Sequence, residues 1–211
     1  MQKTQTFIRN LVAIATLTAA GIAQAAVGLY NTGVDAGGNP LPLGTVDSHY
    51  TVDGGDAYAF DASGNYPVGP WLGDNPTSAW ISPTTTTFAI SGATYTYATS
   101  FDLTGIDLGT AFIAGRWASD DPVTDIRLNG NTLGLAGGNY TYWTPFTIAS
   151  GFTSGINTLA FDVINSGGGP TGLRVEFTDL RFTPAVPEPQ TYAMLIAGLT
   201  VAGIFLRRRK V

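Results

Sequence analysis

Short runs of alternating apolar and polar residues fill the middle of the chain. Leu159, Phe161 and Val163 fall on one face of an extended segment, while Asp162 points the other way. The run Leu173–Phe177 repeats the pattern. A period of two residues is typical of a strand with one buried face. No amphipathic helical pattern appears between the two ends of the chain, so we expect an all-β body.

We expect eight or nine strands in this body, joined by turns. Asn129-Gly130 lies between two apolar runs and predicts a two-residue hairpin, because both positions favour a positive φ. The predicted fold is an antiparallel β-sandwich or jelly roll, flanked by a signal-peptide helix and a C-terminal transmembrane helix. The expected strands are Thr45–Val52, Thr87–Ile90, Thr94–Leu103, Ala111–Ala118, Thr124–Leu128, Thr132–Leu135, Tyr140–Ile148, Asn157–Asn165 and Leu173–Phe182.

The first 25 residues have a pattern of their own. Lys3 and Arg9 form a positively charged region before an apolar run, Leu11–Ile22, which is short for a membrane span. Ala23 and Ala25 then form a small-x-small site for signal peptidase. We therefore predict a signal peptide over residues 1–25, export by the Sec machinery, and a mature chain that begins at residue 26. The alternative is an uncleaved membrane anchor.

Residues 184–211 form a three-part tail. Pro187-Glu188-Pro189 comes first, and its two prolines favour a stiff, extended segment. Tyr192–Leu206 is uncharged and predicts a transmembrane helix of about 22 Å, short for a hydrocarbon core of about 30 Å. The basic cluster Arg207-Arg208-Arg209-Lys210 follows and stays in the cytoplasm by the positive-inside rule. The β domain is therefore expected outside the inner membrane.

This three-part order resembles the PEP-CTERM sorting signal. The resemblance implies that an exosortase, a transpeptidase-like membrane enzyme, recognises the tail and cuts it at Pro187-Glu188-Pro189. The protein would then cross the inner membrane transiently and reach the cell surface or extracellular matrix of a Gram-negative-type envelope. The alternative is a permanent anchor with a single span.

Charge separates the ends of the chain from the body. Between Ala26 and Val186, four arginines stand against fourteen acidic residues, which gives the body a net charge of −10. A body this acidic would be repelled by phosphate backbones, which argues against nucleic acid as a partner. The chain has no cysteine, so disulfides and cysteine-bound zinc are excluded.

The body has a second resemblance. Phe112–Asp121 is followed by Ile126–Gly130, Gly155–Leu159 and Gly172–Val175, which gives a strand, an acidic turn, a strand ending in Asn-Gly and a Gly-x-Asn-x-Leu strand. This order is similar to that of galactose-binding-like jelly rolls, the accessory domains of many glycosidases and lectins. The resemblance implies such a domain over residues 26–183. Many of these domains bind carbohydrate, and some carry a structural calcium.

Aromatic side chains are the candidate glycan-binding groups, because flat rings stack on the apolar faces of sugars. Trp71 lies with Asp74 in a loop rich in proline and glycine, where both exposure and burial of the ring remain open. Tyr142 and Trp143 face opposite ways along an expected strand, so we expect one of them at the surface. The two tryptophans in apolar runs are expected in the core: Trp80 and Trp117.

The chain has few residues suited to catalysis. His49 is the only histidine, so a Ser-His-Asp triad would depend on it, and no nucleophile motif lies near it. One histidine also excludes a multi-histidine metal site. Glu176, the only glutamate of the body, lies on the outer face of an expected strand. The aspartates form no Asp-x-Asp-x-Asp loop, so we expect turn capping and no cofactor, with structural calcium implied only by the resemblance.

Two hypotheses from different classes remain for the body, and a hydrolase, tested by activity on a panel of glycosides, is a distant third. The preferred one is a non-catalytic exported protein whose β domain binds extracellular polysaccharide. The second is a structural or adhesive envelope protein that contacts other proteins through edge strands and has no saccharide ligand. Saccharide binding supports the first hypothesis, and concentration-dependent self-association supports the second.

Overall fold

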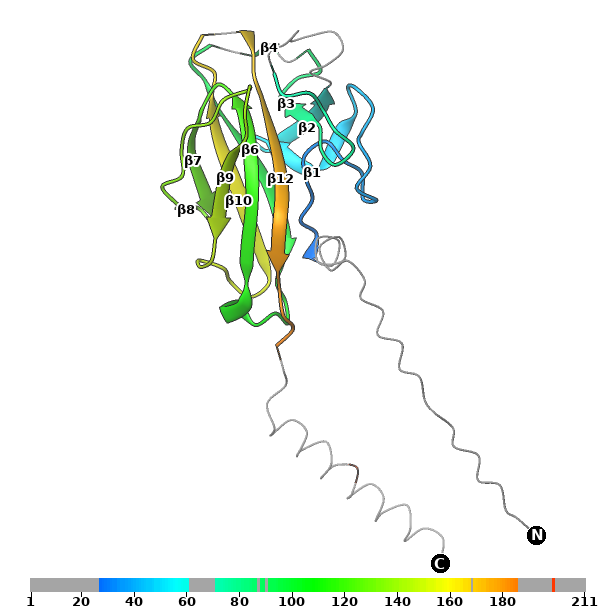
Figure 1. Cartoon of the computed structure of the whole chain (residues 1–211), viewed down its shortest axis with the longest axis vertical. Helices are drawn as coiled ribbons and strands as arrows, with labels where there is room; N and C mark the ends of the chain where they lie inside the picture. The colour runs from blue at the N-terminus through cyan, green and yellow to red at the C-terminus, as the bar shows by residue number, and fades with distance from the viewer. Residues whose placement is uncertain are drawn as a thin grey trace, which may run out of the picture.

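The computed structural model describes residues 27–60, 71–86, 88–89, 91–167, 169–185 and Leu199. These residues form an all-β body with one short 3-10 helix, η1 (Figure 1). In chain order the elements are β1 (Val46–Val52), β2 (Gly55–Phe60), β3 (Trp80–Ser82), β4 (Phe88–Ala89), β5 (Thr94–Asp102), η1 (Leu108–Thr110), β6 (Phe112–Asp120), β7 (Val123–Leu128), β8 (Asn131–Thr132), β9 (Thr144–Ile148), β10 (Ile156–Ile164), β11 (Gly169–Pro170) and β12 (Gly172–Arg181).

Ten of these strands form one antiparallel sheet in the order β8-β7-β10-β5-β1-β2-β3-β12-β6-β9, and β4 pairs separately with β11. The sheet curls so that its two halves pack face to face (Figure 1). Phe146 on β9 and Phe161 on β10 lie 5.9 Å apart between ring centroids, although six strands separate β9 from β10 in the sheet. The predicted all-β antiparallel fold is therefore confirmed, with the two packed halves giving it the form of a sandwich.

The core between the two halves follows the alternation of the strands. Leu159, Phe161 and Val163 of β10 are fully buried, while Asp162 points outward and accepts a hydrogen bond from Arg127 at 2.6 Å. Burial of each large apolar side chain stabilises the fold by about 1.5–3 kcal/mol. A slip of one residue would bury Asp162 instead, so this pattern fixes the register of β10.

The hairpin between β7 and β8 forms at the predicted Asn-Gly pair. Asn129 has φ 53° and Gly130 has φ 79°, and Arg127 pairs with Thr132 across the turn. Asn129 also holds the turn against β10, because its side-chain oxygen accepts a hydrogen bond from the Thr158 backbone N–H at 3.0 Å. The pair therefore determines both the turn and its contact with the neighbouring strand.

Three strands were not predicted, and two predicted strands are shorter than expected. Of the unpredicted strands, β3 has three residues and β11 two, and β2 begins with Gly-Asp, which carries no strand signal. The expected strand Thr132–Leu135 is reduced to β8, because Gly134 has φ 66° and interrupts the extended backbone. The expected strand Tyr140–Ile148 begins only at Thr144. The Asn139 side chain accepts hydrogen bonds from the backbone N–H and hydroxyl of Thr141, which folds residues 139–142 into a turn.

β3 and β12 share only one residue pair, and the N-terminal segment Val27–Val34 lies along this junction, called the seam below. Thr32 lies in this seam. Its backbone N–H donates to the carbonyl of Val175 at 3.1 Å, and its hydroxyl donates to the carbonyl of Ala79 at 2.8 Å. Leu29 is fully buried in the core. This N-terminal segment is therefore an integral part of the body.

Both predicted ends of the chain lie outside the described residues. This holds for the signal peptide over residues 1–25, the motif at 187–189 and the basic cluster at 207–210; of the predicted transmembrane helix over 192–206, only Leu199 is described. Within the described residues, no helix has the length and apolar character needed to cross a membrane. The described body ends with Ala185, whose backbone N–H donates to the carbonyl of Gly105 at 2.8 Å.

Candidate functional site

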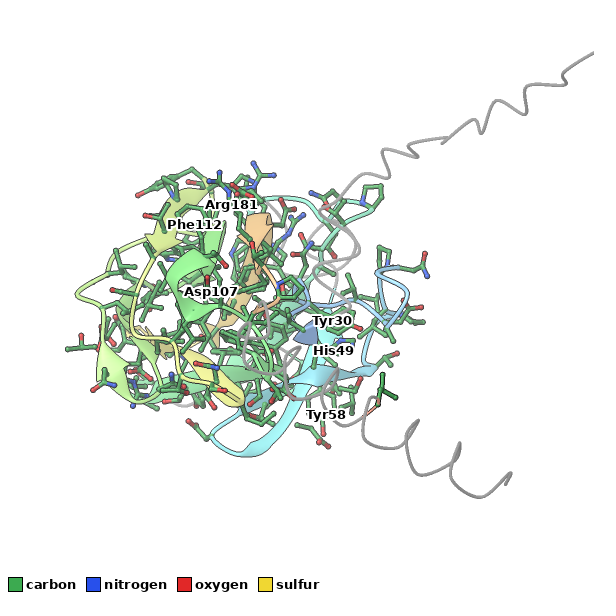
Figure 2. The ribbon with its side chains drawn as sticks, turned by 90° about the horizontal axis from the view of Figure 1, so that it is seen from below. Tyr30, His49, Tyr58, Asp107, Phe112 and Arg181 are labelled. Carbon is green, nitrogen blue, oxygen red and sulfur yellow. The ribbon has the colours of Figure 1, made fainter. Side chains whose placement is uncertain are left out.

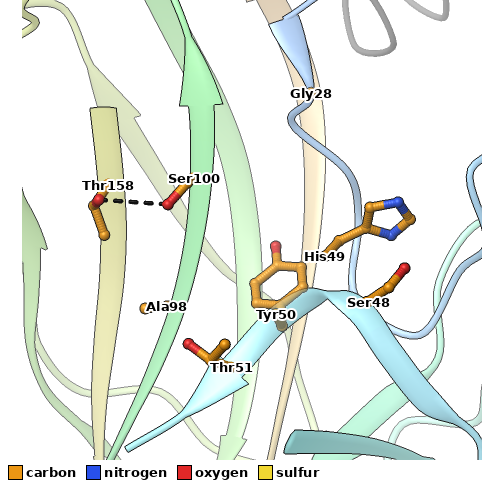
Figure 3. Close-up of a pocket in the computed structure, with 8 residues that line it drawn as sticks. All are labelled: Gly28, Ser48, His49, Tyr50, Thr51, Ala98, Ser100 and Thr158. Atoms are coloured by element: carbon orange, nitrogen blue, oxygen red, sulfur yellow. Dashed lines mark hydrogen bonds between the residues drawn. The ribbon is translucent and has the colours of Figure 1, made fainter. Parts of the chain in front are cut away.

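An open groove lies on the outer face of the sheet where β1, β5 and β10 run side by side (Figure 3). Its volume is about 390 Å³. Small side chains, several of them hydroxylated, form most of its surface, and two rings from β1 complete it. The lining residues are Gly28, Ser48, His49, Tyr50, Thr51, Ala98, Ser100 and Thr158.

The floor of the groove follows from the alternation of β5 and β10. Tyr97 and Phe101 point into the core, so Ala98 and Ser100 point outward. Ser100 is paired with Thr158 of β10, and their hydroxyl oxygens lie 3.5 Å apart. Because the outward side chains are small, they leave the surface of the sheet uncovered, and a hollow forms there.

The N-terminal segment and β1 form the wall of the groove. The rings of Tyr30 and His49 stack at a centroid distance of 3.9 Å, and Figure 2 shows them side by side. The Tyr50 hydroxyl donates to the carbonyl of Tyr30 at 2.9 Å, and His49 Nδ1 lies 3.1 Å from the carbonyl oxygen of Val34. These contacts hold the N-terminal segment against β1, so the wall combines two separate parts of the sequence.

A buried carboxylate supports this wall from behind. Asp47 is fully buried and accepts hydrogen bonds from the backbone N–H of Gly33 at 2.7 Å and of His49 at 2.9 Å. Burial raises the pKa of Asp47, and the two N–H groups together with His49 oppose that rise. Asp47 therefore holds the start of β1 to the N-terminal segment and fixes the backbone of His49.

The lining suits hydrogen bonding to a hydroxylated molecule. The hydroxyls of Ser48, Ser100 and Thr158 each donate and accept hydrogen bonds. Among the described residues, no hydroxyl donates to His49, and no carboxylate lines the groove. The arrangement therefore lacks both the nucleophile–histidine pair and the carboxylate pair of hydrolytic sites. None of the four predicted glycan-binding residues lines this groove.

Three of the predicted residues, Trp71, Asp74 and Trp143, lie on another outer surface, over β2, β3, β12 and β6. Trp71 packs against Phe60, Trp80 and Tyr140 at ring-centroid distances of 5.6, 4.4 and 5.7 Å. Its side chain is only 9% exposed. Of the two interpretations left open for Trp71, the structure favours a core residue, because neighbouring rings pack against the indole. The predicted burial of Trp80 and Trp117 is confirmed.

Trp143 and Asp74 meet at Arg174, although the sequence separates these residues widely. The Arg174 guanidinium carbon lies 4.9 Å from the Trp143 ring centroid, and the Arg116 guanidinium carbon lies 4.5 Å from the same ring. Asp74 Oδ1 lies 4.0 Å from Arg174 Nη1. Burial lowers the pKa of Arg174, while the charges of Asp74 and Glu176 oppose that change. The Trp143 ring therefore takes part in a partly buried cation–π cluster.

Glu176 joins this cluster from β12. It accepts hydrogen bonds from Arg116 Nε at 2.8 Å, from the Ser78 hydroxyl at 2.7 Å and from the Asn75 amide at 2.7 Å. Burial alone would raise the pKa of Glu176, but the hydrogen bonds from Ser78, Asn75 and Arg116 outweigh it and hold the pKa below its ordinary value. Glu176 lies on the predicted outer face, but residues 75–78 cover it, and only 5% of it is exposed.

Tyr142 is the one predicted residue with a largely exposed ring, at 55% exposure. Glycan binding by Trp71, Asp74, Tyr142 and Trp143 stays a prediction. The packing of the other two rings makes Tyr142 the member best placed to stack on a sugar.

Metal binding has little support among the described residues. No group of three or more His, Asp or Glu side chains there is arranged to hold a metal ion. Asp121 acts in a turn, since its Oδ2 accepts the backbone N–H of Ser166 at 2.6 Å. The structural calcium implied by the resemblance stays a prediction.

Solved structures of similar fold include carbohydrate-binding modules. The CBM35 from Paenibacillus barcinonensis has 17% sequence identity and a TM-score of 0.36, and the match covers 64% of this chain and 99% of that one. A family 35 module from Clostridium thermocellum has 16% identity and a TM-score of 0.35, with coverages of 62% and 95%. At these values the similarity does not extend to a ligand. No curated protein matches the chain.

The tail gives a family match. Residues 185–210 match the model of the PEP-CTERM protein-sorting motif. The match contains Pro187-Glu188-Pro189, the apolar run and the basic cluster in the predicted order. It begins at Ala185, where the described body ends. The predicted sorting signal is therefore confirmed: the chain carries a PEP-CTERM protein-sorting motif at residues 185–210.

Proposed function

We propose that the protein is an exported surface or matrix protein that binds extracellular polysaccharide and catalyses no reaction. The sorting motif supports the export half of this proposal. The observation that carries the binding half is the open groove on β1, β5 and β10, with its hydroxylated lining. Its volume of about 390 Å³ falls within the range of small-ligand sites. Because the groove is open, a polymer can pass across it with one segment bound.

The proposed route has two processing steps. Signal peptidase cuts after Ala25 once the Sec machinery has moved the chain across the inner membrane, and an exosortase then cuts within Pro187-Glu188-Pro189. The intact mass of the protein recovered from the envelope or the medium tests both steps. We expect a chain that begins at Ala26 and ends at the motif. A mass that still includes Arg207-Arg208-Arg209-Lys210 would instead support a permanent anchor.

The binding half is tested by affinity electrophoresis against a panel of soluble polysaccharides. We expect at least one polymer to retard the wild-type protein. Ala98→Leu fills the floor of the groove and is expected to weaken that binding by about tenfold or more. Thr147→Leu adds an apolar side chain of the same kind on the exposed outer face of β9, in the half of the sandwich opposite the groove, and is expected to bind as the wild type does.

A further variant separates the groove from the exposed ring. Tyr142→Ala removes the ring without disturbing a packed cluster, because Tyr142 is largely exposed. If this variant loses binding while Ala98→Leu keeps it, the site lies at Tyr142 and the groove is the wrong location. If no polysaccharide binds the wild type, the binding half of the proposal is wrong. Release of reducing sugar from a bound polymer would contradict the non-catalytic half.

A further inference from the structure

We infer that the groove takes a polysaccharide without anionic groups, and that it discriminates against polyuronates and sulfated polymers. This inference rests on the proposed function and specifies the class of ligand. It follows from where the body keeps its positive charges.

Every arginine of the body already has a carboxylate partner. Arg116 contacts Glu176 at 2.5 Å, Arg127 contacts Asp162 at 2.6 Å, and Arg181 contacts Asp179 at 2.5 Å. Arg181 also lies over the ring of Phe112 (Figure 2).

The fourth arginine is buried as well as paired. Arg174 is 1% exposed and lies 3.5 Å from Glu176. The sequence has no lysine between Lys3 and Lys210, so these four arginines are the only arginine or lysine side chains of the body. Recognition of carboxylate or sulfate groups normally uses an arginine or lysine that is free to form a charge-assisted hydrogen bond. Each of the four arginines is paired and none of them lines the groove, so the groove has no arginine or lysine to offer an anionic sugar.

The surroundings of the groove are acidic. Asp102 lies two residues after Ser100 on β5 and therefore on the same face of the sheet. It is exposed, and hydrogen bonds from the side chain and backbone of Thr104 hold its pKa below the ordinary value, so it stays charged. A uronate that continued along β5 from the groove would approach this carboxylate. The net charge of −10 over the body adds repulsion at longer range.

The groove itself favours uncharged hydroxyl groups. His49 contributes the only ring nitrogens of the lining, and no arginine, lysine or carboxylate side chain is among the lining residues. The other polar groups are hydroxyls, which pair with the hydroxyls of a neutral sugar without any loss of charge solvation. The lining and its surroundings therefore point to the same class of ligand.

The first experiment compares polymers on the processed protein recovered from the envelope or the medium, which lacks the basic residues of both ends of the chain. Affinity electrophoresis at pH 8 and low salt uses neutral polymers (a mannan, a xylan, a galactan and a β-glucan) and anionic ones (polygalacturonate, alginate and heparin), each with and without added CaCl₂. We expect at least one neutral polymer to bind with a dissociation constant at least tenfold lower than that of any anionic polymer. We also expect salt to change that binding little.

The second experiment adds the missing cation. Thr158→Lys places one positive charge in the groove and is expected to strengthen binding to polygalacturonate at least fivefold at 20 mM salt, with the gain lost at 500 mM salt. Thr147→Lys adds the same charge on β9, away from the groove, and is expected to give a much smaller gain. This pair separates a local effect of the groove from a general reduction of negative charge.

The outcomes separate the two proposals. Binding of an anionic polymer by the wild type as tightly as any neutral one, with or without calcium, overturns the inference and leaves polysaccharide binding intact. Equal gains in polygalacturonate binding from Thr158→Lys and Thr147→Lys also overturn the inference, because the effect of the added charge would then not depend on its position in the groove. Binding of no polymer at all overturns the proposed function and this inference with it.

Discussion

Replacement of Asp120 by asparagine is expected to stabilise the body at neutral and alkaline pH but not near pH 4. Asp120 ends β6, next to Asp121. Burial raises its pKa to about 7, and the charge of Asp121 and a hydrogen bond with Asp121 contribute to the rise. An acid whose pKa rises on folding binds a proton more tightly in the folded state. Its contribution to stability is therefore fully present below the unfolded pKa of 3.8 and is lost as the pH rises toward 7.

The size of the effect follows from the pKa. A rise from 3.8 to about 7 corresponds to at most about 4 kcal/mol, at about 1.4 kcal/mol for each pKa unit. The carboxyl is only partly buried, so water screens its interactions, and we expect about 1–2 kcal/mol. An amide side chain has no charge to desolvate, so Asp120→Asn removes this loss. For a domain of this size the gain corresponds to a rise in Tm of about 2–8 °C.

Thermal unfolding from pH 4 to pH 9, followed by circular dichroism, measures this difference. Asp56→Asn is the matched control, because it removes one negative charge from an exposed position on β2. The Tm of Asp120→Asn relative to the wild type is expected to rise between pH 4 and pH 8, and the control is expected to show a much smaller change. A difference that is constant over this range, or an equal rise in the control, would refute the reasoning.

Three further substitutions test the packing. Glu176→Gln leaves Arg116 and Arg174 facing a neutral group and is expected to cost about 3 kcal/mol in urea unfolding; a loss below about 1 kcal/mol would mean that the ion pairs contribute little. Gly115→Ala brings a Cβ to 2.6 Å from the Phe146 ring and is expected to cost about 2 kcal/mol or more, whereas Gly55→Ala, with its nearest atom at 3.5 Å, should change stability by less than about 0.5 kcal/mol. Thr32→Val removes the hydroxyl that donates to Ala79 and accepts from the Val175 backbone, and a loss of about 1–3 kcal/mol in the same assay is expected; no loss would mean that the seam does not depend on this residue.

The long strands could be predicted because each buries every second side chain. β5, β10 and β12 begin and end within one residue of the predicted ranges. β3 could not be predicted in this way, since it has three residues, all of them buried, and no alternation to detect. Its extended form is imposed by its partners: Ile81 pairs with Ala59 on one side and with Leu173 on the other. Short strands of this kind depend on tertiary pairing rather than on local pattern.

The groove could not be predicted, because its two sides come from distant parts of the sequence. Its floor contains the outward residues of β5 and β10, which alternation does indicate. Its wall depends on the stacking of Tyr30 on His49, which no local pattern signals. The composition of the loop around Trp71 likewise did not predict whether its ring is buried. Proline and glycine predict a loop there, but not that its tryptophan packs against Trp80.

Alternation also predicted the direction of Arg174 and Glu176 but not their burial. Both point away from the main core, as expected for residues opposite Leu173 and Val175. An outward side chain is exposed only if nothing covers that face of the sheet. Here Ser78 bonds to both side chains, and Arg174 also donates to the carbonyl of Gly73, so residues 73–78 form a second polar layer. The sequence determined the direction of these side chains, whereas tertiary structure determined their environment.

The edges of the sheet bear on the two hypotheses for the body. Assembly through edge strands requires a long strand with unpaired backbone groups. In the described sheet, the two edge strands are β8, which has only two residues, and β9, whose Pro145 has no backbone N–H to donate. Both ends are therefore poor templates for an added strand. The groove with its hydroxylated lining lies on a face of the sheet instead, so the architecture favours a ligand that rests on that face over a partner that extends the edge.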